Sequence, residues 1–76
     1  MRKAELEFMI NYRIEQLVTF LMEDYNMPML EAFGCVYNSR TYELLTRPET
    51  GFYFESPGYV YSYLTEEVEA RNVKGT

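Results

Sequence analysis

Residues 5–25, with the sequence ELEFMINYRIEQLVTFLMEDY, carry the strongest structural pattern in the chain. On a helical wheel most of their apolar side chains gather in one half-circle: Leu6, Met9, Ile10, Ile14, Leu17, Val18, Phe20, Leu21 and Tyr25. The other half holds mostly polar side chains: Asn11, Glu15, Gln16, Thr19 and Glu23. This period of 3.6 residues predicts an amphipathic helix about 30 Å long. Since the apolar half-circle is wider than one neighbour requires, we expect this helix to be the central member of a bundle.

Two further helices are predicted after it. Pro28 pushes the residue before it out of the helical region and suits the first turn of a second helix, predicted over residues 28–46. Gly34 and the pair Asn38-Ser39 weaken that pattern, so the segment is either one helix or two short ones broken near Asn38. A third helix is predicted over residues 57–71, because Ser56 can cap it and Pro57 suits its first position.

The connection before the third helix is rich in turn-forming and aromatic residues. Arg47-Pro48-Glu49-Thr50-Gly51 is typical of a turn, because Pro ends a helix and Gly tolerates positive φ. Phe52-Tyr53-Phe54-Glu55 forms either a short strand or an irregular loop, and the loop is favoured because a lone strand has no partner. We expect Phe52 and Phe54 to plug one end of the bundle. The predicted fold is therefore all-α: one domain over residues 1–76, a small three-helix bundle with a short aromatic loop between helices two and three.

Composition and charge limit the classes of partner. The chain has 76 residues, of which 47% are hydrophobic, and a formal net charge of −5. An acidic surface repels phosphate backbones and anionic lipids, so nucleic acid is disfavoured as a partner and a membrane is not expected. Cys35 is the only cysteine, which fits a reducing cytoplasm, and neither a signal peptide nor a transmembrane helix is expected.

The residues that most chemistry requires are missing or isolated. The chain has no His, and Cys35 has no second cysteine, so neither a zinc site nor a Cys–His nucleophile can be assembled. The carboxylates Glu66, Glu67 and Glu69 lack the spacing of a calcium loop, and the glycines do not form a phosphate-binding loop. We therefore expect a non-enzymatic protein with no metal, no cofactor and no small-molecule substrate.

Three apolar side chains interrupt the polar side of the first helix: Phe8, Tyr12 and Met22. Phe8 and Tyr12 are four residues apart and thus adjacent on the helix surface. Several apolar residues on one exposed face indicate contact with another chain. The function predicted first is therefore protein–protein interaction, and the expected assembly is a homodimer, with another protein as the alternative partner.

Two charged residues lie inside apolar stripes. Arg13 falls between Met9 and Leu17 on the first helix, and Glu67 falls within the apolar face of the third. A charge in such a position either extends to water or finds a partner. One interpretation is a partly buried Arg13–Glu67 ion pair between these helices, and the other is that both side chains reach solvent separately.

The order of features also allows a comparison. An amphipathic helix closing on Tyr25, then Leu30-Glu31-Ala32, then the segment 36–42 (VYNSRTY) and a last helix starting at Ser56 span residues 5–70. In this the chain resembles a family of small helical domains of unknown function from anaerobic gut bacteria. Members of such families are sometimes encoded beside predicted ADP-ribosyltransferase-like toxins. The resemblance thus implies an antitoxin-like or regulatory partner of a neighbouring toxin, and it carries over no functional residues.

A third hypothesis is a nucleic-acid-binding regulator. Arg40, Tyr42 and Arg47, with Tyr53 nearby in the sequence, form a basic and aromatic set of the kind that stacks on bases. The acidic residues between them, such as Glu43 and Glu49, oppose phosphate binding. This hypothesis predicts a basic stripe near Arg40 and Arg47.

Overall fold

The computed structural model describes residues 2–75, and the side chains of residues 2–71. Its elements are α1 (Lys3–Tyr25), α2 (Met29–Tyr37), α3 (Arg40–Leu45), the 3-10 turns η1 (Pro48–Thr50) and η2 (Phe52–Phe54), and α4 (Pro57–Gly75). Within residues 2–75 there is no β-strand, so the predicted all-α fold class is confirmed. The predicted arrangement of three helices is not, because the described chain has four α-helices.

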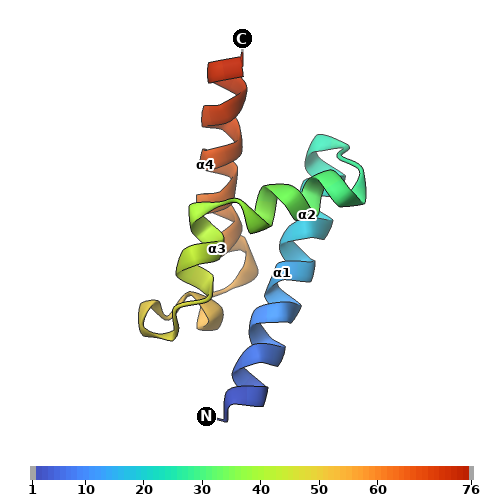
Figure 1. Cartoon of the computed structure of the whole chain (residues 1–76). Helices are drawn as coiled ribbons and strands as arrows, with labels where there is room; N and C mark the ends of the chain where they lie inside the picture. Colours follow the sequence, from blue (N-terminus) through green and yellow to red (C-terminus); the bar gives the residue numbers. More distant parts are fainter. Residues whose placement is uncertain (1, 76) are drawn as a thin grey trace.

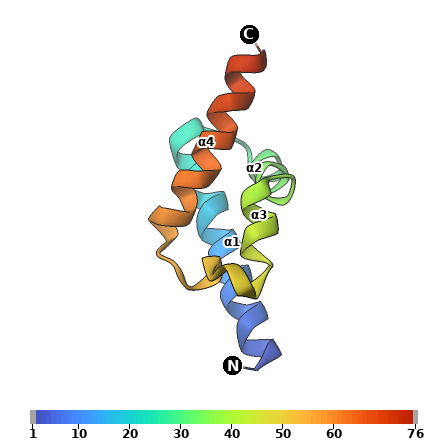
Figure 2. The same cartoon turned by 90° about the vertical axis from the view of Figure 1, so that its left-hand side faces the viewer.

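The two long helices α1 and α4 lie against each other, and the short helices α2 and α3 pack beside them (Figures 1 and 2). The molecule is elongated, with extents of 44 × 21 × 18 Å. The buried residues of α1 are Ile14, Leu17, Val18 and Leu21, all in its C-terminal half. The first turns of α1 consequently project beyond the packed region at one end of the molecule (Figure 1).

The chain reverses after α1 because Asn26 adopts the left-handed conformation, with φ of 56°. Asparagine tolerates this region better than most residues, and it ends the helix. Pro28 then lies just before α2 and not inside it, so the second helix begins at Met29. From there α2 runs crosswise over the C-terminal end of α1 (Figure 1).

The segment predicted as one or two helices is broken at Asn38 and Ser39. The buried Ser39 hydroxyl donates to the carbonyl of Val36 at 2.6 Å and accepts from the backbone N–H of Tyr42 at 3.0 Å. The Ser39 hydroxyl thus pairs a free carbonyl at the end of α2 and a free N–H at the start of α3, which favours two helices over one.

The aromatic loop is built from η1 and η2, separated by Gly51. Gly51 has φ of 74°, which a residue with a side chain adopts only with strain. Phe52 packs against the core as expected, but the prediction for Phe54 is wrong: its side chain is 74% exposed and Tyr53 takes the inner position. The reason is the 3-10 geometry, since residues two apart share a side in a strand but not in a turn of three residues.

α4 begins where the sequence predicted and carries the second half of the core. The hydroxyl of Ser56 accepts a hydrogen bond from the N–H of Tyr59 at 3.3 Å, which caps the helix. Val60, Leu64 and Val68 are buried in the cluster that the α1 residues also form. The helix continues to Gly75, four residues beyond the predicted end at 71.

Two hydrogen bonds between phenols and carboxylates join the C-terminal end of α1 to α4. The hydroxyl of Tyr25 donates to Glu69 at 2.5 Å, and that of Tyr61 donates to Asp24 at 2.7 Å. The hydrogen bond to Glu69 raises the pKa of Tyr25 to about 12. Burial, together with the bond to Asp24, raises the pKa of Tyr61 above its ordinary value. Each helix supplies one phenol and one carboxylate, which fixes how the two helices pair in this region.

Candidate functional site

The projecting part of α1 carries two of the residues predicted to form an interface. Phe8 is 71% exposed and Tyr12 is 54% exposed. Their rings are parallel within 3°, with centroids 6.5 Å apart, because residues four apart share a helix face. They lie on the side of α1 opposite to the core residues Leu17 and Leu21. The structure therefore places both aromatic rings on an outer surface.

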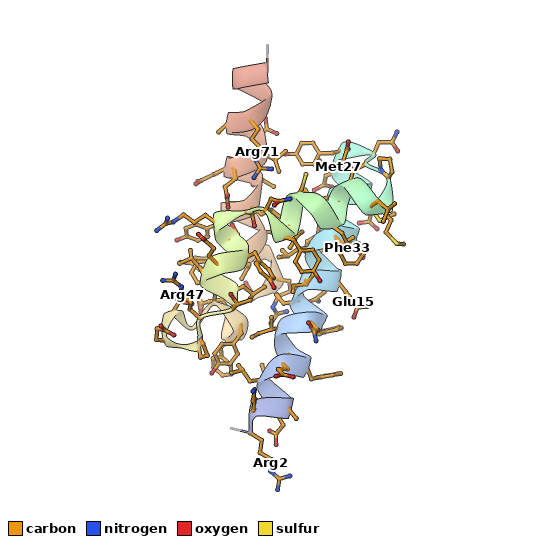
Figure 3. All side chains as sticks on the ribbon, in the orientation of Figure 1. Arg2, Glu15, Met27, Phe33, Arg47 and Arg71 are labelled. Atoms are coloured by element: carbon orange, nitrogen blue, oxygen red, sulfur yellow. The ribbon has the colours of Figure 1, made fainter. Side chains whose placement is uncertain are left out.

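Further apolar side chains surround this pair. Leu6, Met9 and Ile10 are only partly buried, and Ile10 packs against the core. We call residues 3–13 the α1 arm. Exposed charges border it: Arg2 precedes it, with its Nε 4.0 Å from Glu5, and Glu15 follows and points away from the domain (Figure 3). The α1 arm is thus a helical surface that carries apolar side chains and also the exposed charges of Lys3, Glu5 and Glu7.

Met22 does not belong to this surface. It is partly buried and packs against the core, so it does not share the outer surface of Phe8 and Tyr12, and its role in an interface stays a prediction. A helical wheel cannot show this, because it contains no information about which neighbour covers a given face.

Glu67, predicted to pair with Arg13, instead binds the start of α3. Its carboxylate accepts from the backbone N–H groups of Arg40 at 2.7 Å and Thr41 at 2.9 Å, and from the Thr41 hydroxyl at 2.5 Å. Burial favours the neutral acid, but the hydrogen bonds from Thr41 and Arg40 outweigh it and lower the pKa of Glu67. Glu67 is therefore a charged side chain on α4 that holds α3 in place.

Arg13 has other partners. Its Nη1 donates to Gln16 at 2.5 Å and its Nη2 to the carbonyl of Tyr53 at 3.5 Å, while its buried Nε has no hydrogen-bond partner. Between the described side chains of Arg13 and Glu67 there is no hydrogen bond or ion pair, so the predicted pair is wrong. Because the chain breaks at Asn38, a new helix starts at Arg40, and the N–H groups at that start donate to the Glu67 carboxylate.

The structure also has a hollow that the sequence did not predict as a site. Residues 50–55 and Tyr59 line an open depression of about 600 Å³, which we call the aromatic hollow. Its rings come from η2 and from the first turn of α4. The signal was present in the sequence as the run Phe52-Tyr53-Phe54 followed by Tyr59, but only the turn at Gly51 brings these residues together.

The basic and aromatic residues considered for nucleic-acid binding do not form one surface. Arg40 lines a hollow of about 410 Å³ between α3 and α4 together with Glu66 and Glu67. Tyr42 and Tyr53 both pack against the core, which leaves little of either ring for stacking on bases. Arg47 is exposed and points away from the domain beside η1 (Figure 3).

The described residues contain no group of three or more His, Cys, Asp or Glu side chains arranged to hold a metal ion. None of the helices in the described chain combines the length and apolarity needed to cross a bilayer. In comparisons with known proteins, no family model, no curated protein and no solved structure matches the chain.

Proposed function

We propose that the protein is a non-enzymatic protein–protein interaction domain that associates with itself through the α1 arm. The observation that carries this proposal is the stacked pair of Phe8 and Tyr12, exposed on a helical segment that projects from the core. Aromatic side chains bury large areas with little loss of conformational freedom, and they are frequent anchors of interfaces.

The size of the apolar surface suits a modest association. Burying large apolar side chains between two copies favours association, and the translation and rotation that the copies lose oppose it. The partly buried Leu6, Met9 and Ile10 add to the favourable side. We expect a dimer that forms at micromolar concentration.

A second copy is the partner that fits the arm most simply. A twofold axis near Phe8 and Tyr12 buries the same apolar patch on both copies, which closes the assembly. Exposed charges beside the pair contribute little energy to such a contact.

Sedimentation of charged variants tests the proposal. The double substitution Phe8→Glu and Tyr12→Glu places like charges at the centre of the interface, so we expect a monomer whose circular dichroism remains helical. Leu30→Glu and Phe54→Glu are matched controls, because both side chains are highly exposed outside the arm, and they should leave the dimer intact. A wild-type protein that stays monomeric at high micromolar concentration would contradict self-association. Dissociation by either control would contradict the arm as its location.

A further inference from the structure

The aromatic hollow has the chemistry of a cation site. It lies between η2 and α4, and neither Phe8 nor Tyr12 lines it. We propose that it binds an organic ammonium group, such as the side chain of a lysine or methylated lysine, or a free quaternary amine. This site is additional to self-association and does not depend on it.

The rings offer faces to a bound cation. Phe54 is 74% exposed and Tyr59 is 45% exposed, so each has uncovered ring surface. Phe54 is inclined by 54° to Tyr53, and Tyr59 by 60° to Phe52, with both pairs of centroids 6.2 Å apart. A cation within about 6 Å of a ring centroid is attracted to the negative face of that ring.

The charge of the hollow favours a cation over a neutral or anionic group. Glu55 is its only acidic residue, and no basic residue lines it. Glu55 and Tyr59 both line the hollow. The hydrogen bond with Tyr63 raises the pKa of Tyr59, so this phenol stays neutral at physiological pH. A carboxylate beside neutral rings complements an ammonium ion.

Several hydrogen bonds hold the walls of the hollow in place before any ligand arrives. The Thr50 hydroxyl donates to the carbonyl of Leu44 at 2.6 Å and accepts from the N–H of Phe52 at 3.2 Å. The N–H of Phe54 donates to the carbonyl of Gly51 at 3.0 Å. A site whose backbone is already ordered loses little conformational freedom on binding. The volume of about 600 Å³ is ample for a trimethylammonium group.

The test compares choline with 3,3-dimethyl-1-butanol, which has the same shape but no charge. Both are titrated into the protein, and the aromatic ¹H–¹³C signals of Phe54 and Tyr59 are followed by NMR. We expect choline to shift these signals to saturation, with an affinity at least about fivefold higher than that of the alcohol. Equal affinities, or no shift with choline, would overturn the proposal.

Substitutions test whether choline binds in the aromatic hollow. Phe54→Leu keeps apolar bulk but removes a ring face, and Glu55→Gln removes the charge, so each should weaken choline binding at least about threefold. Tyr37→Leu and Glu49→Gln are the matched controls, since both residues are exposed and neither lines the hollow. Unchanged binding in the first two variants, or equal loss in the controls, would overturn the assignment.

A last comparison separates the two sources of an ammonium group. A peptide containing trimethyllysine and the same peptide containing norleucine are titrated alongside choline. Tighter binding of the trimethyllysine peptide than of choline indicates a protein ligand, and the reverse order indicates a small amine. Because these titrations use the hollow alone, they give the same answer whether the protein is a monomer or a dimer.

Discussion

At the scale of single residues, Glu67 shows how one side chain connects two helices. Its carboxylate accepts three hydrogen bonds from Arg40 and Thr41, at the start of a helix only six residues long. So short a helix is not stable by itself, because few of its backbone groups are paired within it. We infer that α3 depends on this carboxylate as well as on the burial of Leu45.

Replacing Glu67 by glutamine should reveal this dependence. The variant retains one acceptor but turns an N–H₂ group toward backbone donors, so we expect a loss of about 1–3 kcal/mol in the free energy of unfolding near neutral pH. The folded-state pKa of Glu67 lies below its ordinary 4.5. Its contribution is therefore complete above that pH and disappears as the pH falls through the folded-state pKa.

Urea unfolding of wild type and Glu67→Gln between about pH 7 and pH 3 measures this difference. The gap between the two proteins should narrow as the solution becomes acidic. Glu66→Gln is the control, because Glu66 is exposed, and it should change the stability by less than about 0.5 kcal/mol. A gap that stays constant over this pH range would show that the charge of Glu67 is not what stabilises α3.

The separate surroundings of Arg13 and Glu67 lead to a second prediction. Since Arg13 contacts Gln16 and Tyr53 while Glu67 contacts α3, the two side chains should act independently. A double-mutant cycle with Arg13→Met and Glu67→Gln should give a coupling energy below about 0.5 kcal/mol. Coupling above about 1 kcal/mol would restore the ion pair that the sequence suggested.

At the scale of elements, the junction between α2 and α3 is the most informative feature. Ser39 is buried, and its hydroxyl both donates to Val36 and accepts from Tyr42. Substituting Ser39 by alanine leaves the N–H of Tyr42 without its cap, so we expect a loss of about 1–2 kcal/mol. The free energy of urea unfolding measures it.

Ser62→Ala is the matched control for this junction. Ser62 is an exposed serine inside α4 whose hydroxyl also donates to a carbonyl three residues earlier, that of Tyr59, at 2.6 Å. Because it caps no helix, its loss should change the stability by less than about 0.5 kcal/mol. Equal effects at Ser39 and Ser62 would mean that the break between α2 and α3 does not depend on the cap.

The elements also show what local sequence can predict. α1 and the start of α4 follow from apolar periodicity, from Ser56 and from Pro57, all of which act within a few residues. The break at Asn38 was one of two open alternatives, because the cap supplied by Ser39 competes with continued helix at similar energy. Local sequence patterns are sufficient to predict an element when the interacting residues lie within one or two helical turns of each other.

The features that the sequence did not predict all depend on distant neighbours. Met22 packs against the core, and the Glu67 carboxylate accepts hydrogen bonds from a helix start that lies 26 and 27 residues away in the chain. Tyr53 replaces Phe54 at the core because η2 is a 3-10 turn, a choice set by Gly51 and by the packing of the loop. The aromatic hollow arises from the same turn and was missed for the same reason.

At the scale of the whole molecule, the surfaces proposed to bind partners lie outside the packed centre. The α1 arm projects at the N-terminal end, and the aromatic hollow lies between η2 and α4. A chain of 76 residues buries a smaller fraction of its surface than a larger domain and has a thin margin of stability. Association through the arm would raise that margin by mass action, so we expect the midpoint of thermal unfolding to rise with protein concentration.

Isotope-filtered NOE spectroscopy on an equimolar mixture of ¹³C-labelled and unlabelled protein tests self-association most directly, because it detects contacts between copies only. We expect intermolecular NOEs that connect the rings of Phe8 and Tyr12 in one copy with the α1 arm of the other. The absence of intermolecular NOEs at millimolar concentration, or their appearance only at side chains such as Leu30 and Phe54, would contradict this expectation.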